Sequence, residues 1–196
     1  SFNCGRSKVI YNSVEISDDL GSSDVEFPNP DSSKIILNIG RLHKSKNQEL
    51  LIKLMPSLPD YRLYLVGKGD DRDYLEGLSY KESVADRVHF LGDICRADVF
   101  RLLRSVDVFA FPSVREAFGL SVLEAALVKC PIVCSNLDVF YEVVGDIPEY
   151  VDGYDKECWV KAIRSAVKRN YNGDNLQLSL KYSNDEMVAK YFESFK

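Results

Sequence analysis

Short, nearly continuous apolar runs recur along the chain and alternate with amphipathic stretches. Such runs are typical of strands buried on both faces of a parallel sheet, because a strand with one wet face would show alternating polar positions. They predict strands at 34–40, 61–67, 87–92, 106–111 and 131–135, with shorter strands at 8–11 and 150–151. Helices are predicted at about 46–57, 70–83, 97–105, 119–129, 155–170 and 184–195.

Strands and helices that alternate with short connections form βαβ units. The chain is therefore predicted to be an α/β domain with a parallel sheet and helices on both faces. Residues 13–33 are rich in Ser, Asp, Pro and Asn and are expected to form an irregular connection. Ligands of such sheets bind beyond the carboxyl ends of the strands, so the residues that follow each strand are the functional candidates.

Composition narrows the classes of function. The chain has 196 residues, 45% of them hydrophobic, which suits one domain with a substantial core. Its net charge of −5 and the lack of a basic block argue against nucleic acid binding, whereas a small phosphate ligand needs only one or two local cations.

Five cysteines without a CxxC pair, and only two histidines, indicate reduced, mostly buried thiols of a cytosolic protein and give little support to a metal site. No apolar run approaches the roughly 20 residues of a membrane span, and no signal peptide is recognisable.

Two cations follow the strand at 34–40. Gly40 allows a tight turn and a close ligand approach, Arg41 offers a planar fork for phosphate oxygens, and Lys46 offers a compact charge. Together they could hold a diphosphate without a metal. The alternative is a pair of solvated loop charges.

The residues at the ends of the next two predicted strands are weaker candidates for ligand binding. Gly67 and Gly69 are too few for a dinucleotide fingerprint, and they indicate either a tight strand-to-helix turn or a ligand that approaches the backbone. Backbone groups of Leu91 could read the edge of a nucleobase, although a plain strand end accounts for this position as well.

The strongest segment runs from Phe111 to Glu124. Gly119 is expected at the start of a helix, where free N–H groups and the helix dipole favour an anion. Glu116 lies before it in the loop and Glu124 inside the helix, so two carboxylates could accept hydrogen bonds from sugar and ribose hydroxyls on either side of a diphosphate. The alternative has Glu116 capping the helix and Glu124 facing solvent. The apolar neighbours of Glu124 favour a functional carboxylate, because a charge drawn toward a buried face needs a partner.

In order and spacing, these segments resemble the nucleotide-binding half of family 4 glycosyltransferases, the retaining group 1 enzymes of the GT-B fold. The resemblance covers nearly the whole chain, and its motifs are more specific together than singly. They are 9–15 (VIYNSVE, with Ser13 in place of a glycine), 38–42 (NIGRL) with Lys46, 65–69 (LVGKG), 88–92 (VHFLG), Glu116 and Glu124 with seven residues between them, and 142–145 (EVVG). Residues 135–138 (SNLD) lack the glycine pair often found there.

The resemblance implies a Rossmann-like sheet that forms one half of a GT-B fold and binds a UDP- or GDP-sugar, without a metal or other cofactor. Arg41 and Lys46 would bind the donor diphosphate and stabilise the departing charge. Glu116 would hold the donor sugar and Glu124 the ribose. Backbone N–H groups of Phe118, Gly119 and Leu120 would face the donor, with Gly40, Gly67, Gly69 and Leu91 completing its site.

The resemblance also implies a wider setting. Residues 1–196 would be the C-terminal donor-binding domain, and the N-terminal acceptor domain, absent from this chain, would pack on the helix at 184–195. The full protein would work in the bacterial cytoplasm at the inner face of the membrane, as a peripheral protein of polysaccharide or lipopolysaccharide assembly. Two alternatives stay open, a GT-B epimerase or hydrolase of sugar nucleotides and a non-catalytic interaction module. Gly-Arg-Leu and the seven-residue spacing argue against the first, and the intact charged residues against the second.

Overall fold

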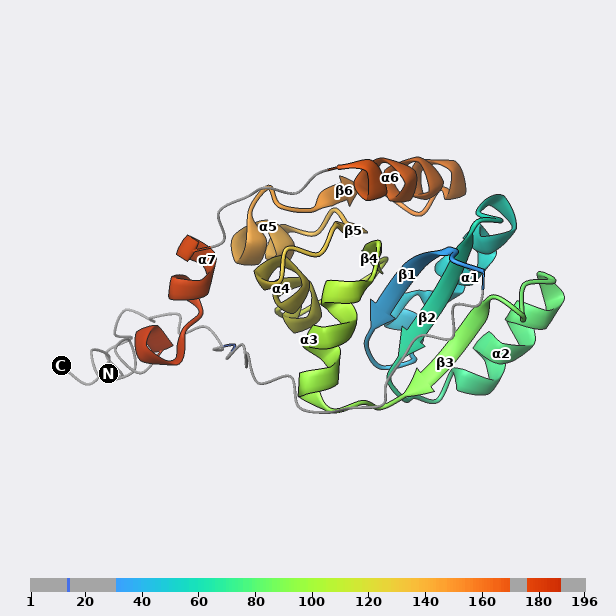
Figure 1. The fold of residues 1–196 in the computed structure, drawn as a ribbon, viewed down its shortest axis with the longest axis horizontal. Helices are drawn as coiled ribbons and strands as arrows, with labels where there is room; N and C mark the ends of the chain where they lie inside the picture. Colours follow the sequence, from blue (N-terminus) through green and yellow to red (C-terminus); the bar gives the residue numbers. More distant parts are fainter. Residues whose placement is uncertain (1–13, 15–30, 170–175, 188–196) are drawn as a thin grey trace, which may run out of the picture.

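A computed structural model describes residue 14 and residues 31–169 and 176–187. Its six strands form one fully parallel sheet in the order β3-β2-β1-β4-β5-β6 (Figure 1). The strands are β1 Lys34–Ile39, β2 Tyr61–Val66, β3 Val88–Gly92, β4 Val108–Phe111, β5 Ile132–Ser135 and β6 Glu149–Val151. This is the Rossmann order, in which the direction of strand addition reverses between β1 and β4, and ligands bind at that switch point.

Helices cover both faces of the sheet. They are η1 Lys44–Lys46, α1 Gln48–Leu54, η2 Met55–Ser57, α2 Arg72–Lys81, α3 Arg96–Ser105, α4 Leu120–Leu127, α5 Asp138–Val144, α6 Lys156–Lys168 and α7 Leu176–Lys181. One core lies between the sheet and α3, α4 and α5, and a second between the sheet and α1, α2 and α6 (Figure 1). Within β1, Leu37 belongs to the first core and Ile36 to the second, which explains why the strand is apolar at nearly every position.

The predicted α/β fold with a parallel sheet is confirmed. All five long strands are present, each within two residues of its predicted ends, and β6 lies at the predicted 150–151. The predicted helix at 46–57 is instead a 3₁₀ turn, α1 and a second 3₁₀ turn. The break before α1 occurs because Asn47 adopts the left-handed conformation, with φ of 54°, which ends the first turn at Lys46.

Two helices were missing from the predicted pattern. α5 and α7 have only seven and six residues, too few to show a clear 3.6-residue period. α5 exists because Phe140, Val143 and Val144 are buried in the first core, so tertiary packing outweighs its β-branched composition.

Some predictions lie outside the described residues. These are the strand at 8–11, almost all of the connection at 13–33, Cys4, and the final helix beyond residue 187. Of that helix the structure describes residues 184–187, which are helical.

The prediction that the cysteines are mostly buried holds for two of the four described ones. Cys130 and Cys134 are buried free thiols, whereas Cys95 and Cys158 are exposed. Burial raises the pKa of the Cys130 thiol to about 12. Over the described ranges, no helix combines the length and apolarity needed to cross a bilayer.

Candidate functional site

Backbone hydrogen bonds join the loops that leave the first three strands of the sheet. The Gly40 amide donates to the Val66 carbonyl at 2.9 Å, and the Leu42 amide donates to the Lys68 carbonyl at 3.0 Å. The Gly67 amide donates to the Gly92 carbonyl at 2.7 Å. The predicted glycines therefore lie together at the carboxyl edge of the sheet, in loops that support one another.

This packing explains Gly67 and Gly69 without a ligand. Gly67 has φ of 125°, and a Cβ at this position would overlap with the Gly40 carbonyl oxygen. A Cβ at Gly69 would overlap with the Leu42 carbonyl. The tight-turn interpretation thus accounts for both glycines, and a role in donor binding stays a prediction.

A substitution pair tests this packing. Gly69→Ala is expected to lower the free energy of unfolding by about 1–3 kcal/mol, because backbone must move to admit the methyl group. Gly77→Ala is the matched control: Gly77 lies within α2 with open space beside it, and alanine there should stabilise by about 0.5–1 kcal/mol. Urea unfolding of both variants measures the difference. Equal effects would contradict the packing argument.

Lys46 and Glu116, predicted on separate loops, form an ion pair across the carboxyl ends of β1 and β4. Their side chains are 21% and 9% exposed, so the pair is mostly shielded from water. The Lys46 ammonium also lies 5.6 Å from the centre of the Phe111 ring, a favourable cation–π position. The structure therefore places one cation and one carboxylate together at the switch point of the sheet.

Ser113, which was not among the predicted site residues, organises this pair. Its side chain is fully buried, and its hydroxyl lies 3.0 Å from the Ser45 carbonyl and 3.3 Å from Glu116 Oε1. The Val114 amide donates to the same Ser45 carbonyl at 2.8 Å. These bonds fix the turn that carries Lys46 against the loop that carries Glu116. The one available hint was a small polar residue directly after Pro112, at the end of a buried strand.

Arg41 pairs with a different carboxylate, Asp70. Its guanidinium donates to Asp70 at 2.8 Å, and the two side chains are 65% and 79% exposed. Its carbonyl accepts a hydrogen bond from Gln48 Nε2 at 3.0 Å, so the backbone is held while the head is on the surface. An exposed ion pair contributes at most about 1 kcal/mol, so an anionic ligand could draw the guanidinium away from Asp70.

Gly119 begins α4 as predicted. It is the N-cap residue with φ of 83°, and no side chain caps the helix. The alternative in which Glu116 caps this helix is therefore wrong. A Cβ at Gly119 would lie only 2.5 Å from Phe140 Cε1, so close packing as well as the left-handed backbone requires glycine here.

Glu124 does not face solvent, which rules out the second part of that alternative. Its side chain is 14% exposed, and burial raises the pKa of this carboxyl, opposed by the positive charge of Arg96. A guanidinium nitrogen of Arg96 lies 3.7 Å from Glu124 Oε1. Arg96 was missed in the sequence. The signal available was a cation in the first turn of a helix, where the dipole disfavours positive charge unless an anion is close.

The remaining predicted residues lie around this edge. Leu91 and Phe118 are partly buried against the core that α3, α4 and α5 form, while Leu120 is exposed at the start of α4. Within the described part of the chain, no group of three or more His, Cys, Asp or Glu is placed to hold a metal ion.

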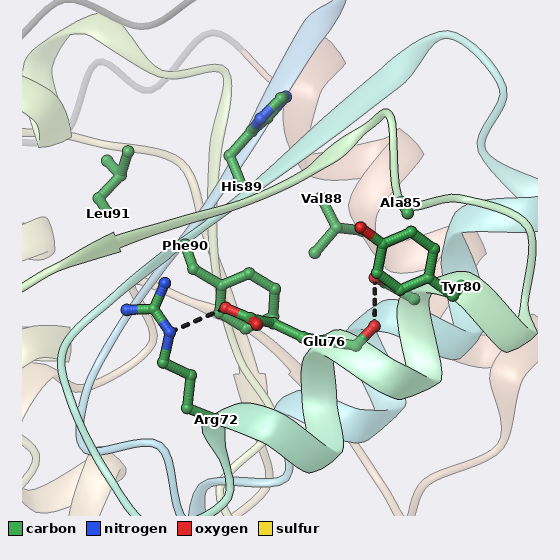
Figure 2. Close-up of a pocket in the computed structure, with 9 residues that line it drawn as sticks. Arg72, Glu76, Tyr80, Ala85, Val88, His89, Phe90 and Leu91 are labelled. Carbon is green, nitrogen blue, oxygen red and sulfur yellow. Dashed lines mark hydrogen bonds and ion pairs between the residues drawn. The ribbon is translucent and has the colours of Figure 1, made fainter.

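A groove of about 420 Å³ lies elsewhere, between α2 and the edge strand β3 (Figure 2). Arg72 and Glu76 form an ion pair at 2.8 Å on its α2 side, and the Arg72 guanidinium lies 5.7 Å from the centre of the Phe90 ring. Among the predicted site residues, only Leu91 lines it. Because Lys46 and Glu116 do not line it, the groove is a separate surface from the edge that carries this ion pair.

Comparison with known proteins identifies the family. Residues 22–186 match the family model described as glycosyl transferases group 1, and because this range is most of the chain, the chain belongs to that family. Its six-stranded parallel sheet is the fold of one Rossmann-like half of GT-B glycosyltransferases.

Individual relatives agree with this placement. An uncharacterized glycosyltransferase of Methanocaldococcus jannaschii is 37% identical over an alignment of 148 positions that covers 70% of this chain and 38% of that protein. The O-antigen biosynthesis glycosyltransferase WclY of Escherichia coli is 26% identical over 200 residues, covering 95% of this chain and 54% of that protein. The crystal structure of Anabaena HepE in complex with UDP and glucose matches with a TM-score of 0.75 and 22% identity, over 83% of this chain and 48% of that one. The chain spans about a third to a half of the length of the curated relatives it matches.

Proposed function

We propose that this chain is the C-terminal, donor-binding half of a retaining glycosyltransferase of family 4, which transfers a sugar from a UDP- or GDP-sugar to an acceptor. The observation that carries the proposal is the shielded Lys46–Glu116 pair at the switch point of the sheet. It presents a cation for a diphosphate and a carboxylate for sugar hydroxyls, in a family whose members are glycosyltransferases.

Each charged residue has a distinct role in this proposal. Lys46 and Arg41 bind the diphosphate and stabilise the charge that develops on it as the bond to the sugar breaks, which replaces a metal ion. Glu116 orients the donor sugar. Glu124, at the second turn of α4, accepts hydrogen bonds from the ribose hydroxyls, and the free N–H groups at the start of α4 face the phosphates.

We also propose partners for this domain: an N-terminal acceptor domain, a nucleotide-sugar donor and the membrane surface. The acceptor would bind to an N-terminal half of the full protein, in line with relatives of which this chain covers only 38% and 54%. WclY acts in O-antigen biosynthesis, and HepE was crystallised with UDP and glucose. For this protein we propose a UDP- or GDP-sugar donor and a role in bacterial polysaccharide or lipopolysaccharide assembly, in the cytoplasm, with peripheral association at the inner face of the membrane.

Calorimetric titration tests the proposal. UDP, GDP and their sugar conjugates are titrated into the full-length protein in buffer with EDTA. One nucleotide is expected to bind with a dissociation constant in the range of about 1 μM to 1 mM that is usual for substrates. Product analysis with the bound donor should then show a glycosidic bond of retained configuration. Epimerised or hydrolysed donor, or no binding by any nucleotide, would contradict the assignment.

A further inference from the structure

The loop between β4 and α4, residues 112–119, carries the proposed donor contacts. Val114, Arg115, Ala117 and Leu120 are all exposed. On the β4 side the loop is held by Ser113 and by the Lys46–Glu116 pair, whereas on the α4 side it is held by aromatic packing. The position of its backbone N–H groups therefore depends on the residues that pack against Phe118 and Gly119.

Two aromatic rings make these contacts. Phe140 of α5 packs so closely on Gly119 that no side chain fits there. Tyr182 meets Phe118 edge to face, with ring centres 5.9 Å apart and an angle of 78° between the rings. Since α5 packs against α4 in the same core, Phe140 contributes to the fold as well as to the loop.

Tyr182 occupies a different structural position. It follows α7, which lies beside α4 and α5 in Figure 1, far from β1, β2 and β3. Its side chain is 1% exposed, and its hydroxyl donates to the Val143 carbonyl at 3.0 Å. Its own carbonyl accepts from the Val14 amide at 2.9 Å, so it contacts α5, the loop and a residue from the start of the chain at once.

The residues next to Tyr182 make further contacts with α5 and with the same core. Lys181 Nζ donates to the Glu142 carbonyl at 2.9 Å and lies 4.9 Å from the centre of the Tyr182 ring. Val14 is 5% exposed and belongs to the same core as Tyr182. One buried side chain, that of Tyr182, therefore joins the Phe118 ring to α5, and the Tyr182 backbone bonds to Val14.

We propose that Tyr182 is a positioning residue for donor binding. Its ring holds Phe118, and thereby the N–H groups from Phe118 to Leu120, in the conformation that receives the diphosphate. Because the Val14 amide donates a hydrogen bond to its carbonyl, Tyr182 also links this loop to Val14, near the start of the sequence. The inference rests on the proposed function, since it assigns Tyr182 a role at that same site.

Steady-state kinetics and UDP titration of the full-length protein test it. Tyr182→Ala is expected to raise the KM for the donor and the UDP dissociation constant by about tenfold or more, because small misplacements of a binding group have effects of this size. Tyr182→Phe keeps the ring against Phe118, so its KM should stay within about twofold of the wild-type value. If Tyr182→Ala does not fold, Phe118→Leu removes the same ring contact from the loop side and is expected to raise KM in the same direction.

Tyr61→Ala is the matched control for loss of a buried tyrosine. Tyr61 is 4% exposed and lies in the core between the sheet and α1, α2 and α6. It is the first residue of β2, so it lies at the amino ends of the strands, opposite to the proposed site. It is expected to lower Tm to a similar extent while leaving the donor KM within about twofold. Equal KM changes in Tyr61→Ala and Tyr182→Ala would overturn the inference, as would an unchanged KM in Tyr182→Ala. A wild-type protein that binds neither UDP nor GDP would overturn the proposed function itself, and this inference with it.

Discussion

Lys46→Ala in the full-length enzyme is expected to lower kcat on the order of 10²–10³-fold, the effect usual for the loss of one preorganised charge-stabilising group. Lys46 pairs with Glu116 and lies over the face of Phe111, while Ser113 holds Glu116 and the carbonyl of the preceding Ser45. Its ammonium therefore requires little reorganisation to meet a developing negative charge. Its removal also leaves the mostly buried Glu116 carboxylate without its cation, which would repel the donor phosphates. Initial rates at saturating donor measure the effect.

Lys53→Ala is the matched control. Lys53 also pairs with a glutamate, Glu49, but on the surface of α1 with side chains 34% and 37% exposed. Because such exposed pairs contribute little, its kcat should stay within about twofold of the wild-type value and its stability within about 0.5 kcal/mol. A Lys46→Ala enzyme that keeps its kcat would contradict the proposed role of the pair.

Glu124→Ala is expected to weaken donor binding by about 10- to 100-fold, because hydrogen bonds to a charged group are each worth roughly 1.5–3 kcal/mol. The carboxylate is 14% exposed, and Arg96, the cation that pairs with it among the described residues, lies 3.7 Å away, a distance that leaves its oxygens able to accept hydrogen bonds from a ribose diol. Calorimetry with UDP or GDP measures the change. Glu76→Ala is the control, since Glu76 pairs with Arg72 on α2 and is 39% exposed.

The same carboxyl should make donor binding pH-dependent. Burial raises the pKa of Glu124 above its ordinary value, so protonation occurs at a higher pH than for an exposed glutamate. A protonated carboxyl accepts fewer hydrogen bonds, so the wild-type affinity should fall as the pH drops through this raised pKa. In Glu124→Ala this part of the pH dependence should be absent. An identical pH profile in the two proteins would contradict the assignment of Glu124 to the ribose.

The sequence by itself determined the fold class. Each long strand is apolar on both faces, and this pattern is local, so the parallel sheet with two helical layers could be predicted from the runs at 34–40 and 61–67 and their counterparts. The start of α4 at Gly119 was also local information, since the left-handed backbone there favours glycine. By contrast, α5 and α7 are too short to show their own periodicity, and α5 depends on the burial of Phe140, Val143 and Val144 in the core.

The arrangement of the candidate site could not be predicted from the sequence, because its residues come together from distant parts of the chain. The sequence offered Lys46 and Glu116 as separate candidates, but only the adjacency of β1 and β4 brings them into one ion pair. Sequence also left open whether Glu116 caps a helix and whether Glu124 is solvated, and burial and cap geometry decided both. The contacts of Ser113, Arg96 and Tyr182 are visible only in three dimensions, since each has partners that lie elsewhere in the chain. Local patterns therefore determined the long strands and most of the helices, because apolar periodicity is a property of the local sequence. Tertiary packing decided the short helix α5 and which polar groups meet at the carboxyl edge of the sheet, because their partners lie far away in the sequence.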